Sequence, residues 1–368
     1  MMIVIIGPAH PYRGGIADTN ESLAKALIDL GYDIKLFTFS RLYPNRLFPG
    51  KTQFSSKPKP EKIDIERSID SVRPMSWFRT ARTINKMTPS IVIFRYWTPF
   101  LGPCLGTIAR LVRSKCITIV DNAKGHEPKF SESFSLRYVL GAQDGLISLS
   151  NYTSNQLGFI KKIPLITCPH PINCGLAPMI EQEKARAILG LDNNAPVVLF
   201  FGLIRKYKGV DFLIEAVAQL KNQFPNLRVL IVGEPYVSIK PYLKKTKELG
   251  LDDLISFHTT YVEDKDVGVW FSACDCVVQP YQAASQSGIT PMALHYHRPM
   301  VVTDVGGLSE GLKMPVAKIV TPFVSNIADG LANVLKSEQP LKNEFAPYLK
   351  QRSWKSFAKK IITFAQSL

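Results

Sequence analysis

Residues 196–217 read PVVLFFGLIRKYKGVDFLIEAV. The apolar run 197–201 has the length of a β-strand that is buried on both faces. After the loop that follows, apolar residues recur at helical spacing, and Asp211 near the start of this helix suits the positive end of its dipole. Arg205 and Lys208 stand in the loop itself. A basic loop beyond the carboxyl end of a buried strand is typical of a phosphate site in an α/β protein, although a solvated turn between two core elements has the same pattern.

The alternation of strands and helices continues on both sides of this stretch. Strands are expected at residues 3–7, 34–39, 90–96, 116–120, 146–149, 197–201, 229–232, 254–257, 276–279 and 300–303. Because helical patterns separate these strands, each half of the chain is predicted to form a parallel sheet. A chain of 368 residues is long enough for two such domains. The boundary is placed after TCPHPIN, residues 167–173, and the cleft between the domains is the expected ligand site.

The first predicted strand leads into a loop, residues 7–17, that contains Gly14 and Gly15. Paired glycines let a backbone approach a ligand closely. The glycines lack the G-x-G-x-x-G spacing and no acidic residue ends the second strand, so a nicotinamide cofactor is not expected. Further along, residues 40–74 are polar and rich in proline, which predicts a mobile loop or a short excursion.

The formal net charge of +15 is unevenly distributed along the chain. Residues 41–115 hold 15 Lys and Arg against four acidic residues. Such an excess suits nucleic acid, an anionic membrane or a phosphorylated substrate, and nucleic acid is not expected because no motif for it accompanies the charge. Residues 77–86, which include Trp77 and Phe78, and residues 99–115 combine apolar and basic side chains. Both stretches suit a helix at the surface of an anionic leaflet, and an ordinary solvated basic domain is the alternative.

The sequence also indicates a compartment. No run of about 18 apolar residues predicts a transmembrane helix. The start, MMIVIIGPAHPYRGG, has no basic segment before its apolar run and reads as a first strand, not as a signal peptide. The six cysteines have neither redox nor zinc spacing, which favours reduced thiols in a cytoplasmic protein.

Two polar segments are candidate ligand sites. Residues 121–127, DNAKGHE, leave the end of a predicted strand, so His126 is a candidate substrate ligand or acid–base group, with a surface histidine as the alternative. Residues 285–290, SQSGIT, form a small polar loop at the start of a predicted helix. Exposed backbone N–H groups at such a position suit an anion.

Taken in order along the chain, these motifs resemble the family 4 glycosyltransferases, which are retaining enzymes with two facing Rossmann-like domains. Gly14-Gly15-Ile16-Ala17 resembles the glycine loop after the family's first strand, and residues 201–209 resemble its donor-phosphate motif. Residues 275–281 and 299–307 resemble paired landmarks around the last strands. The amphipathic segment that contains Trp354 resembles the helix that crosses back to the first domain. The likeness extends over nearly the whole chain.

The resemblance implies a glycosyltransferase B fold: two Rossmann-like domains facing across a cleft. Residues 1–173 would bind the acceptor, residues 174–350 would bind the nucleotide sugar, and residues 351–368 would form a helix packed back on the first domain. It also implies the site. Arg205, Lys208 and His126 are the expected catalytic residues. The expected donor-binding residues are Gly14, Gly15, Gly202, Tyr261, Gln286, Ser287, Gly288, Ile289, Thr290 and Glu310. Two cations and helix-terminal amides can stabilise a leaving diphosphate, so neither a metal nor a cofactor is expected.

This sequence departs from the family pattern at two places. Leu203 stands where the family usually has arginine, so Arg205 would act from a shifted position. The family's two glutamates, spaced eight apart, are missing: Ala284 or Ser285 takes the first place, and Met292 or Ala293 the second. Gln286 is a neutral substitute and Glu310 is close in sequence. These departures indicate a divergent branch of the family.

The predicted function is transfer of a sugar, with retention, from a UDP- or GDP-sugar to a glycan or lipid-linked acceptor in bacterial polysaccharide or glycoconjugate synthesis. The expected location is the cytoplasm, including the inner face of the membrane. One alternative is an inactive binding or scaffold protein on the same fold, because the glutamates are missing. Another is a sugar-nucleotide 2-epimerase, which would need acid–base groups in the cleft, where only His126 and Glu127 stand out.

Overall fold

The structure is a computed structural model that describes residues 1–44, 52–55, 58–123, 132–158, 162–172 and 175–368. The chain divides into two compact units, Met1–Cys174 with Gln351–Leu368 (unit 1) and Gly175–Lys350 (unit 2). The boundaries predicted after residues 173 and 350 lie within one residue of this division. Each unit is an α/β domain with its own sheet, as the sequence predicts.

Unit 1 is built on a seven-stranded parallel sheet with the order β3-β2-β1-β4-β5-β6-β7. Its strands are β1 (Met2–Ile6), β2 (Asp33–Arg41), β3 (Asp64–Asp70), β4 (Ile91–Tyr96), β5 (Lys115–Val120), β6 (Gly145–Ser148) and β7 (Leu165–Thr167). The loop predicted over residues 40–74 is wrong for residues 64–70, which form β3. β3 is an edge strand in which only Ile65 and Ile69 are apolar, and Lys35 of β2 pairs with Asp64 and Glu66 at 3.3 and 3.0 Å.

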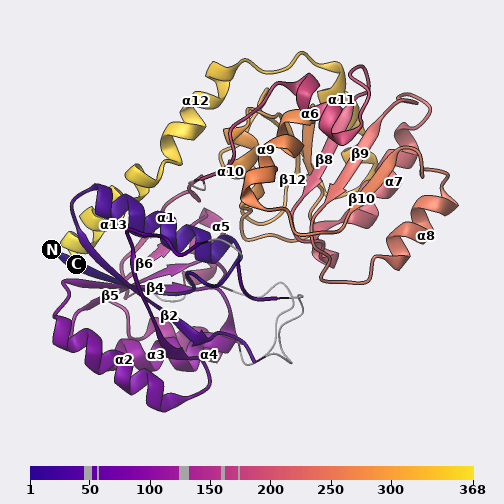
Figure 1. The fold of residues 1–368 in the computed structure, drawn as a ribbon. Helices are drawn as coiled ribbons and strands as arrows, with labels where there is room; N and C mark the ends of the chain where they lie inside the picture. Colours follow the sequence, from indigo (N-terminus) through magenta and orange to yellow (C-terminus); the bar gives the residue numbers. More distant parts are fainter. Residues whose placement is uncertain (45–51, 56–57, 124–131, 159–161, 173–174) are drawn as a thin grey trace. The chain divides into compact units, whose positions relative to one another are not determined.

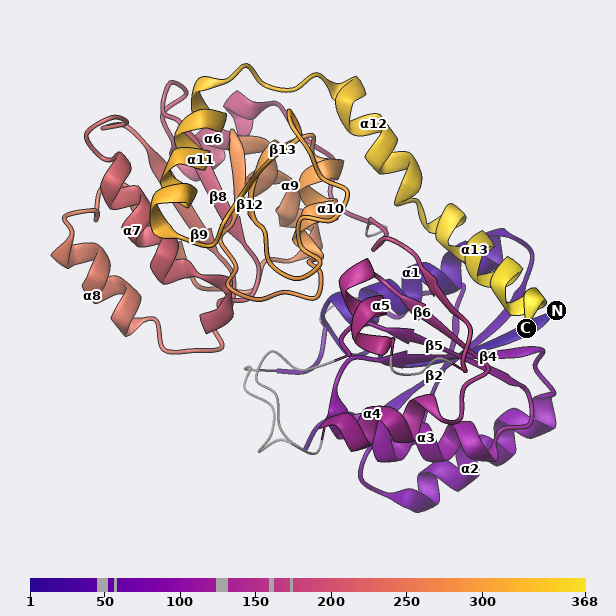
Figure 2. The same cartoon turned by 180° about the vertical axis from the view of Figure 1, so that it is seen from behind.

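Helices cover both faces of this sheet (Figures 1 and 2). They are α1 (Gly15–Asp29), α2 (Pro74–Met87), η2 (Pro99–Leu101), α3 (Gly102–Leu111), α4 (Glu132–Leu140), α5 (Asn151–Leu157) and α13 (Trp354–Ser367). α2, α3 and α4 form one layer, and α1 lies beside α13 on the opposite face. α13 buries Trp354, Phe357 and Ile361 in the same hydrophobic cluster as Ile3 of β1 and Leu23 of α1. The predicted return of the C-terminal helix to the first domain is therefore confirmed.

Unit 2 contains a six-stranded parallel sheet with the order β10-β9-β8-β11-β12-β13. Its strands are β8 (Val197–Phe201), β9 (Arg228–Val232), β10 (Ile255–His258), β11 (Cys276–Gln279), β12 (Met300–Thr303) and β13 (Ala317–Val320). Its helices are α6 (Gln182–Leu189), η3 (Lys206–Lys208), α7 (Val210–Leu220), α8 (Lys240–Glu248), α9 (Asp264–Ala273), α10 (Ile289–His295), α11 (Val324–Lys336) and α12 (Lys342–Gln351).

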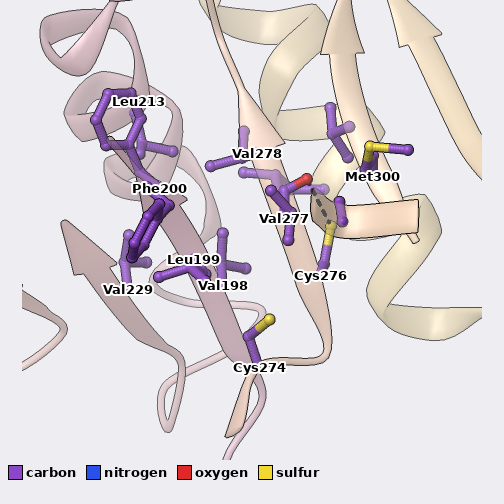
Figure 3. Packing of buried hydrophobic residues seen from close by; sticks show 14 of the residues in the cluster. Val198, Leu199, Phe200, Leu213, Val229, Cys274, Cys276, Val277, Val278 and Met300 are labelled. Carbon is purple, nitrogen blue, oxygen red and sulfur yellow. Dashed lines mark hydrogen bonds between the residues drawn. The ribbon is translucent and has the colours of Figure 1, made fainter. Parts of the chain in front are cut away.

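The opening stretch of the sequence forms the centre of unit 2. All five residues of β8 are buried, and β8 lies between β9 and β11. Figure 3 shows Val198, Leu199 and Phe200 of β8 in one buried hydrophobic cluster with Val277 of β11 and Leu213 of α7. Because both faces of β8 are covered, its sequence is apolar without alternation.

All ten strands predicted from the sequence are present within two residues of their expected bounds. β7 and β13 are short strands that the sequence analysis did not predict. In the part of the chain that the structure describes, no helix has the length and apolar character needed to cross a bilayer.

Candidate functional site

The strand order of unit 2 reverses between β8 and β11, its two central strands. The chain leaves β8 toward β9 on one side and leaves β11 toward β12 on the other. In an open parallel sheet, loops that leave neighbouring strands in opposite directions open a crevice at the carboxyl edge, where ligands bind. The loop after β8 holds the predicted cations, and the loop after β11 holds the predicted polar residues 285–290.

The loop after β8 follows a tightly constrained path. Gly202 has φ +103° and Gly209 has φ +69°, values that side-chain-bearing residues rarely adopt. A Cβ at Gly209 would lie 1.9 Å from the carbonyl oxygen of Pro280, which follows β11. Gln282 donates its backbone N–H to the carbonyl oxygen of Tyr207 at 2.7 Å. The two loops are therefore in direct contact, and glycine is required where they meet.

Arg205 and Lys208 are half-buried, and each lies against an aromatic ring. The Arg205 guanidinium carbon is 4.8 Å from the centroid of the Tyr236 ring, and Lys208 Nζ is 5.1 Å from that of Tyr281. Among the described residues, the ion pairs include neither cation. Burial lowers the pKa of Lys208, and nearby Arg205 lowers it further. An anion bound here would supply the missing counter-charge and would raise that pKa.

The loop after β11 packs against Gly202 and Lys208 of the loop after β8. A Cβ at Gly202 would lie 3.2 Å from both Lys208 Nζ and Ile289 Cδ1. Ser287 Oγ accepts a hydrogen bond from the backbone N–H of Ile289 at 3.1 Å and lies 3.4 Å from Tyr281 Oη. The structure therefore brings together five residues or side chains at the switch point. They are Gly202, Lys208, Tyr281, Ser287 and Ile289.

Three more predicted donor-binding residues lie in this loop. Gln286 Oε1 is buried and has no hydrogen-bond partner among the described residues, so it is an available acceptor. Gly288 has open space around its Cα and is exposed. Thr290 is 4% exposed, and its hydroxyl hydrogen-bonds with the side chain of Gln279, with heavy-atom distances of 3.1 and 3.2 Å. The Thr290 side chain therefore stabilises the loop through Gln279. Its hydroxyl is engaged within the protein, whereas the sequence analysis expects it to bind the donor.

The loop after β12 adds Glu310 to the neighbourhood. Gly307 donates its backbone N–H to the carbonyl oxygen of Ala284 at 3.1 Å, which ties this loop to the one after β11. Glu310 is half-buried three residues later. Asp275, which begins the predicted landmark 275–281, lies at the opposite, amino end of β11. It accepts hydrogen bonds from Arg186 Nη2 and from the Val197 backbone N–H, both at 2.8 Å, so its role is structural.

The remaining predicted site residues are not part of the loops after β8, β11 and β12. Tyr261 follows β10, the edge strand two positions from β8. Gly14 is the residue before α1 in unit 1, with φ +108°, and Gly15 is the first residue of that helix. His126 falls outside the described residues. The sequence reasoning did not single out Tyr236, although a tyrosine that follows a buried strand stands where ligand-facing residues are expected.

The carboxyl edge of the sheet in unit 1 contains a buried ion pair. Arg95 of β4 donates from Nε and Nη2 to the two carboxylate oxygens of Asp121, which follows β5, at 2.5 and 2.6 Å. The two residues are 2% and 3% exposed. His170 is also buried, and its burial, with the charge of Arg95, lowers its pKa to about 4. Asp121 begins the polar segment 121–127, and in that position it neutralises Arg95.

A metal site has no support among the described residues, where no group of three or more His, Cys, Asp or Glu side chains could hold an ion. The expectation that the site works without metal stays a prediction.

Comparison with known proteins extends these observations. Residues 181–363 match the family model described as Glycosyl transferases group 1. The chain is 30% identical over 196 residues to a D-inositol 3-phosphate glycosyltransferase of Streptomyces bingchenggensis, covering 50% of this chain and 43% of that protein. It is 32% identical over 163 residues to a GDP-mannose:glycolipid 4-beta-D-mannosyltransferase of Xanthomonas campestris, covering 43% and 44%. The matches thus span less than half the length of either relative.

Among solved structures, the chain is similar to Anabaena Alr3699/HepE in complex with UDP and glucose, with a TM-score of 0.74. The likeness covers 100% of both chains at 16% sequence identity. At this identity the likeness shows the fold, two Rossmann-like domains in one chain. The facing of these domains across a cleft, which concerns their relative placement, stays a prediction.

Proposed function

Because residues 181–363 place this chain in the glycosyl transferases group 1 family, we propose that it transfers a sugar from a nucleotide sugar to a glycan or lipid-linked acceptor. The observation that carries the proposal is the pair Arg205 and Lys208, two cations without a carboxylate partner among the described residues at the β8/β11 switch point. A nucleotide diphosphate is an anion of the right charge for such a pair.

In the proposed reaction, the bond between the anomeric carbon and the leaving phosphate oxygen breaks while the acceptor oxygen forms a new bond to the same face of that carbon. The acceptor proton passes to the leaving phosphate oxygen. Negative charge develops on the diphosphate, and Arg205 and Lys208 stabilise it from fixed positions. A reaction of this kind needs no pair of carboxylates such as glycoside hydrolases use.

Two observations support a nucleotide sugar as the donor. One similar structure holds UDP and glucose, and one relative is named for GDP-mannose. The unpartnered, buried Gln286 Oε1 offers an acceptor for a donor hydroxyl group in the loop where the family's first glutamate is missing. The glycolipid in the name of the same relative supports a lipid-linked acceptor for this chain.

The proposal places the reaction in the cytoplasm. The described cysteines, Cys104, Cys116, Cys168, Cys274 and Cys276, are all free and buried. Burial raises the pKa of the Cys116 and Cys274 thiols to about 12, so both stay protonated and unreactive. Free thiols without disulfides among the described residues suit a reducing compartment.

A thermal-shift screen tests the donor assignment. The ligands are UDP, GDP and their glucose and mannose conjugates. We expect the ligands that carry one of the two nucleotides to raise the melting temperature of the protein more than those that carry the other. The same ligand should act in the presence of EDTA. If no nucleotide stabilises the protein, or if stabilisation requires added magnesium or manganese, the proposal is wrong in its site or in its metal independence.

The missing glutamates favour a second candidate, a binding or scaffold protein that holds a nucleotide sugar without transferring it. Ala284 and Ser285 are both buried at the first glutamate position, so no carboxylate reaches the site from there. The two candidates differ in turnover. Donor binding with slow hydrolysis of the donor or with transfer to an added acceptor supports the enzyme, and binding without any turnover supports the scaffold.

A further inference from the structure

We propose that the outer face of α2, together with the end of α3, docks on an anionic phospholipid bilayer. The inference concerns a surface of unit 1 and is separate from the proposed sugar transfer. Lipid binding can be measured without donor or acceptor, so the two proposals fail independently.

The first observation is a long stretch without acidic residues. Residues 71–120 contain eight Lys and Arg and no Asp or Glu. One of the eight, Arg95, is buried and neutralised by Asp121. The others include Arg79, Arg82 and Lys86, which are exposed and absent from the ion pairs of the described residues, whereas Arg73 lies 3.7 Å from a carboxylate oxygen of Asp70. The surface that this stretch forms is therefore positive and has no carboxylates of its own to neutralise it.

The second observation is the division of α2 into two faces. Trp77, Ala81 and Ile84 are buried against the core of unit 1. The opposite face begins with exposed apolar side chains, Met75 at 62% and Phe78 at 51%, and continues with the cations at 79, 82 and 86. Large exposed apolar side chains followed by cations on one helix face suit the boundary between headgroups and acyl chains.

Two sequence expectations change here. Trp77 was grouped with the exposed patch, but it is 9% exposed and donates its indole N–H to the carbonyl oxygen of Asp70 at 2.7 Å. The apolar residues within 99–115 also belong to the core, because α3 buries Cys104, Leu105 and Ile108. The patch therefore consists of the outer face of α2 and the cations that follow α3.

The third observation is a groove of about 340 Å³ between the ends of α2 and α3. Phe78, Ala81 and Leu111 give it an apolar floor, and Arg82, Lys86 and Arg113 surround it. Asn85 fixes its shape: Nδ2 donates to the carbonyl oxygen of Leu111 at 2.8 Å, and Oδ1 accepts the backbone N–H of Arg113 at 2.9 Å. Three cations around an apolar floor match the phosphate and glycerol of an anionic lipid.

The choice of a bilayer over other anionic partners rests on the combination of these features. Val72, which precedes α2, is 42% exposed and extends the apolar surface made by Met75 and Phe78. A soluble anion would be bound by the cations alone and would leave these side chains in water. Insertion into the headgroup region buries them, and each cation near an anionic surface contributes about 1 kcal/mol.

Vesicle co-sedimentation of the full chain tests the inference. Vesicles of phosphatidylcholine with about 30% phosphatidylglycerol should bind the protein, and pure phosphatidylcholine should not. Reversing three charges with Arg82→Glu, Lys86→Glu and Arg113→Glu should lower the partition coefficient at least about 100-fold, from about fivefold for each lost attraction. Phe78→Ala should lower it several-fold at unchanged charge.

The matched control reverses three exposed lysines of α8 in unit 2, Lys240→Glu, Lys244→Glu and Lys247→Glu, which changes the net charge by the same amount. Binding should then fall much less than in the α2–α3 variant, and both variants should keep the wild-type melting temperature. Equal loss in the two variants would mean that net charge alone attracts the protein, and the surface assignment would be wrong. Absence of wild-type binding, or equal binding to both kinds of vesicle, would overturn it as well.

Discussion

The two sheets of this protein each place a cation at the carboxyl edge, but they neutralise it differently. In unit 1, Arg95 is buried and donates from Nε and Nη2 to the carboxylate of Asp121. In unit 2, Arg205 and Lys208 rest against tyrosine rings and have no carboxylate partner among the described residues. A buried charge needs a partner, and one supplied by the chain makes it structural. A charge left without one is available to a ligand.

The largest effect is expected from breaking the pair in unit 1. Asp121→Ala leaves Arg95 as an uncompensated buried charge, which should lower the free energy of unfolding by about 3–5 kcal/mol. Denaturant unfolding measures this loss. As a control, Asp64→Ala removes an exposed carboxylate from the edge of the same sheet and should cost less than about 1 kcal/mol. Equal small losses in the two variants would show that the buried pair is not structural.

For the cations of unit 2, we expect substitution to lower activity and not stability. Lys208→Met and Arg205→Ala should each lower the rate of sugar transfer about 10²–10³-fold, because each removes a fixed charge from the developing diphosphate. The Lys208→Met variant should not lose stability, since burial lowers the pKa of Lys208 and its charge therefore opposes folding.

The control in this loop is Lys206→Met, which removes an exposed lysine of η3. Transfer rates and melting temperatures are measured for all three variants. A stable Lys208 variant with the wild-type rate contradicts the site, and an unstable one contradicts the contrast between the two units.

The buried pair in unit 1 should also make stability depend on pH through His170. Its pKa is lowered to about 4 by burial and by the charge of Arg95, so the folded state disfavours the protonated ring. The unfolded state binds that proton near pH 6.5, and stability should therefore be complete above about pH 6.5 and fall as the pH decreases toward 4. The loss is on the order of 3 kcal/mol.

The change His170→Gln removes the titrating group and should flatten this part of the stability curve. Unfolding curves recorded between these pH values check the effect. An unchanged slope in the variant would assign the acid sensitivity to other groups.

The smallest effect is expected from Gln286 in unit 2. Its unpartnered Oε1 is proposed to accept a hydrogen bond from the donor, so Gln286→Ala should weaken donor binding roughly fivefold, equivalent to about 1 kcal/mol. Gln286→Glu keeps the acceptor and should retain affinity. Gln282→Ala is the matched control because this side chain is exposed in the same loop. Calorimetric titration with the nucleotide sugar distinguishes them, and equal affinity in all four proteins would leave Gln286 without a role in binding.

The sequence predicted those elements that have a local pattern. The run 197–201 is apolar at every position because β8 is covered on both faces, and it was identified with the correct bounds. β3 was missed because it lies at the sheet edge, where its charged residues face solvent or Lys35. Edge strands of this kind lack the apolar run that identifies a central strand.

For the site, the sequence placed Lys208 and the loop 285–290 but not their contacts. That Tyr236 lies under Arg205, or that Pro280 meets Gly209, depends on which strands become neighbours. The partner of Arg95 is 26 residues away in the chain and directly follows the adjacent strand, β5. The sequence around Arg95 gave no sign that this cation would be neutralised. Contacts between residues of neighbouring strands depend on the order of strands in the sheet, and local sequence patterns therefore do not predict them.

The return of α13 to unit 1 has a consequence for synthesis on the ribosome. Ile3 and Leu23 belong to a cluster that is complete only when Trp354, Phe357 and Ile361 have joined it. Unit 2 is continuous from Gly175 to Lys350, so all of its residues emerge before those of α13. At about 5–20 residues per second, the part of the first sheet that α13 covers beside α1 stays exposed for on the order of 10–40 s after the strands of that sheet have emerged. The unit that is translated second can thus complete its core first, and the nascent first unit exposes apolar surface to chaperones throughout that interval.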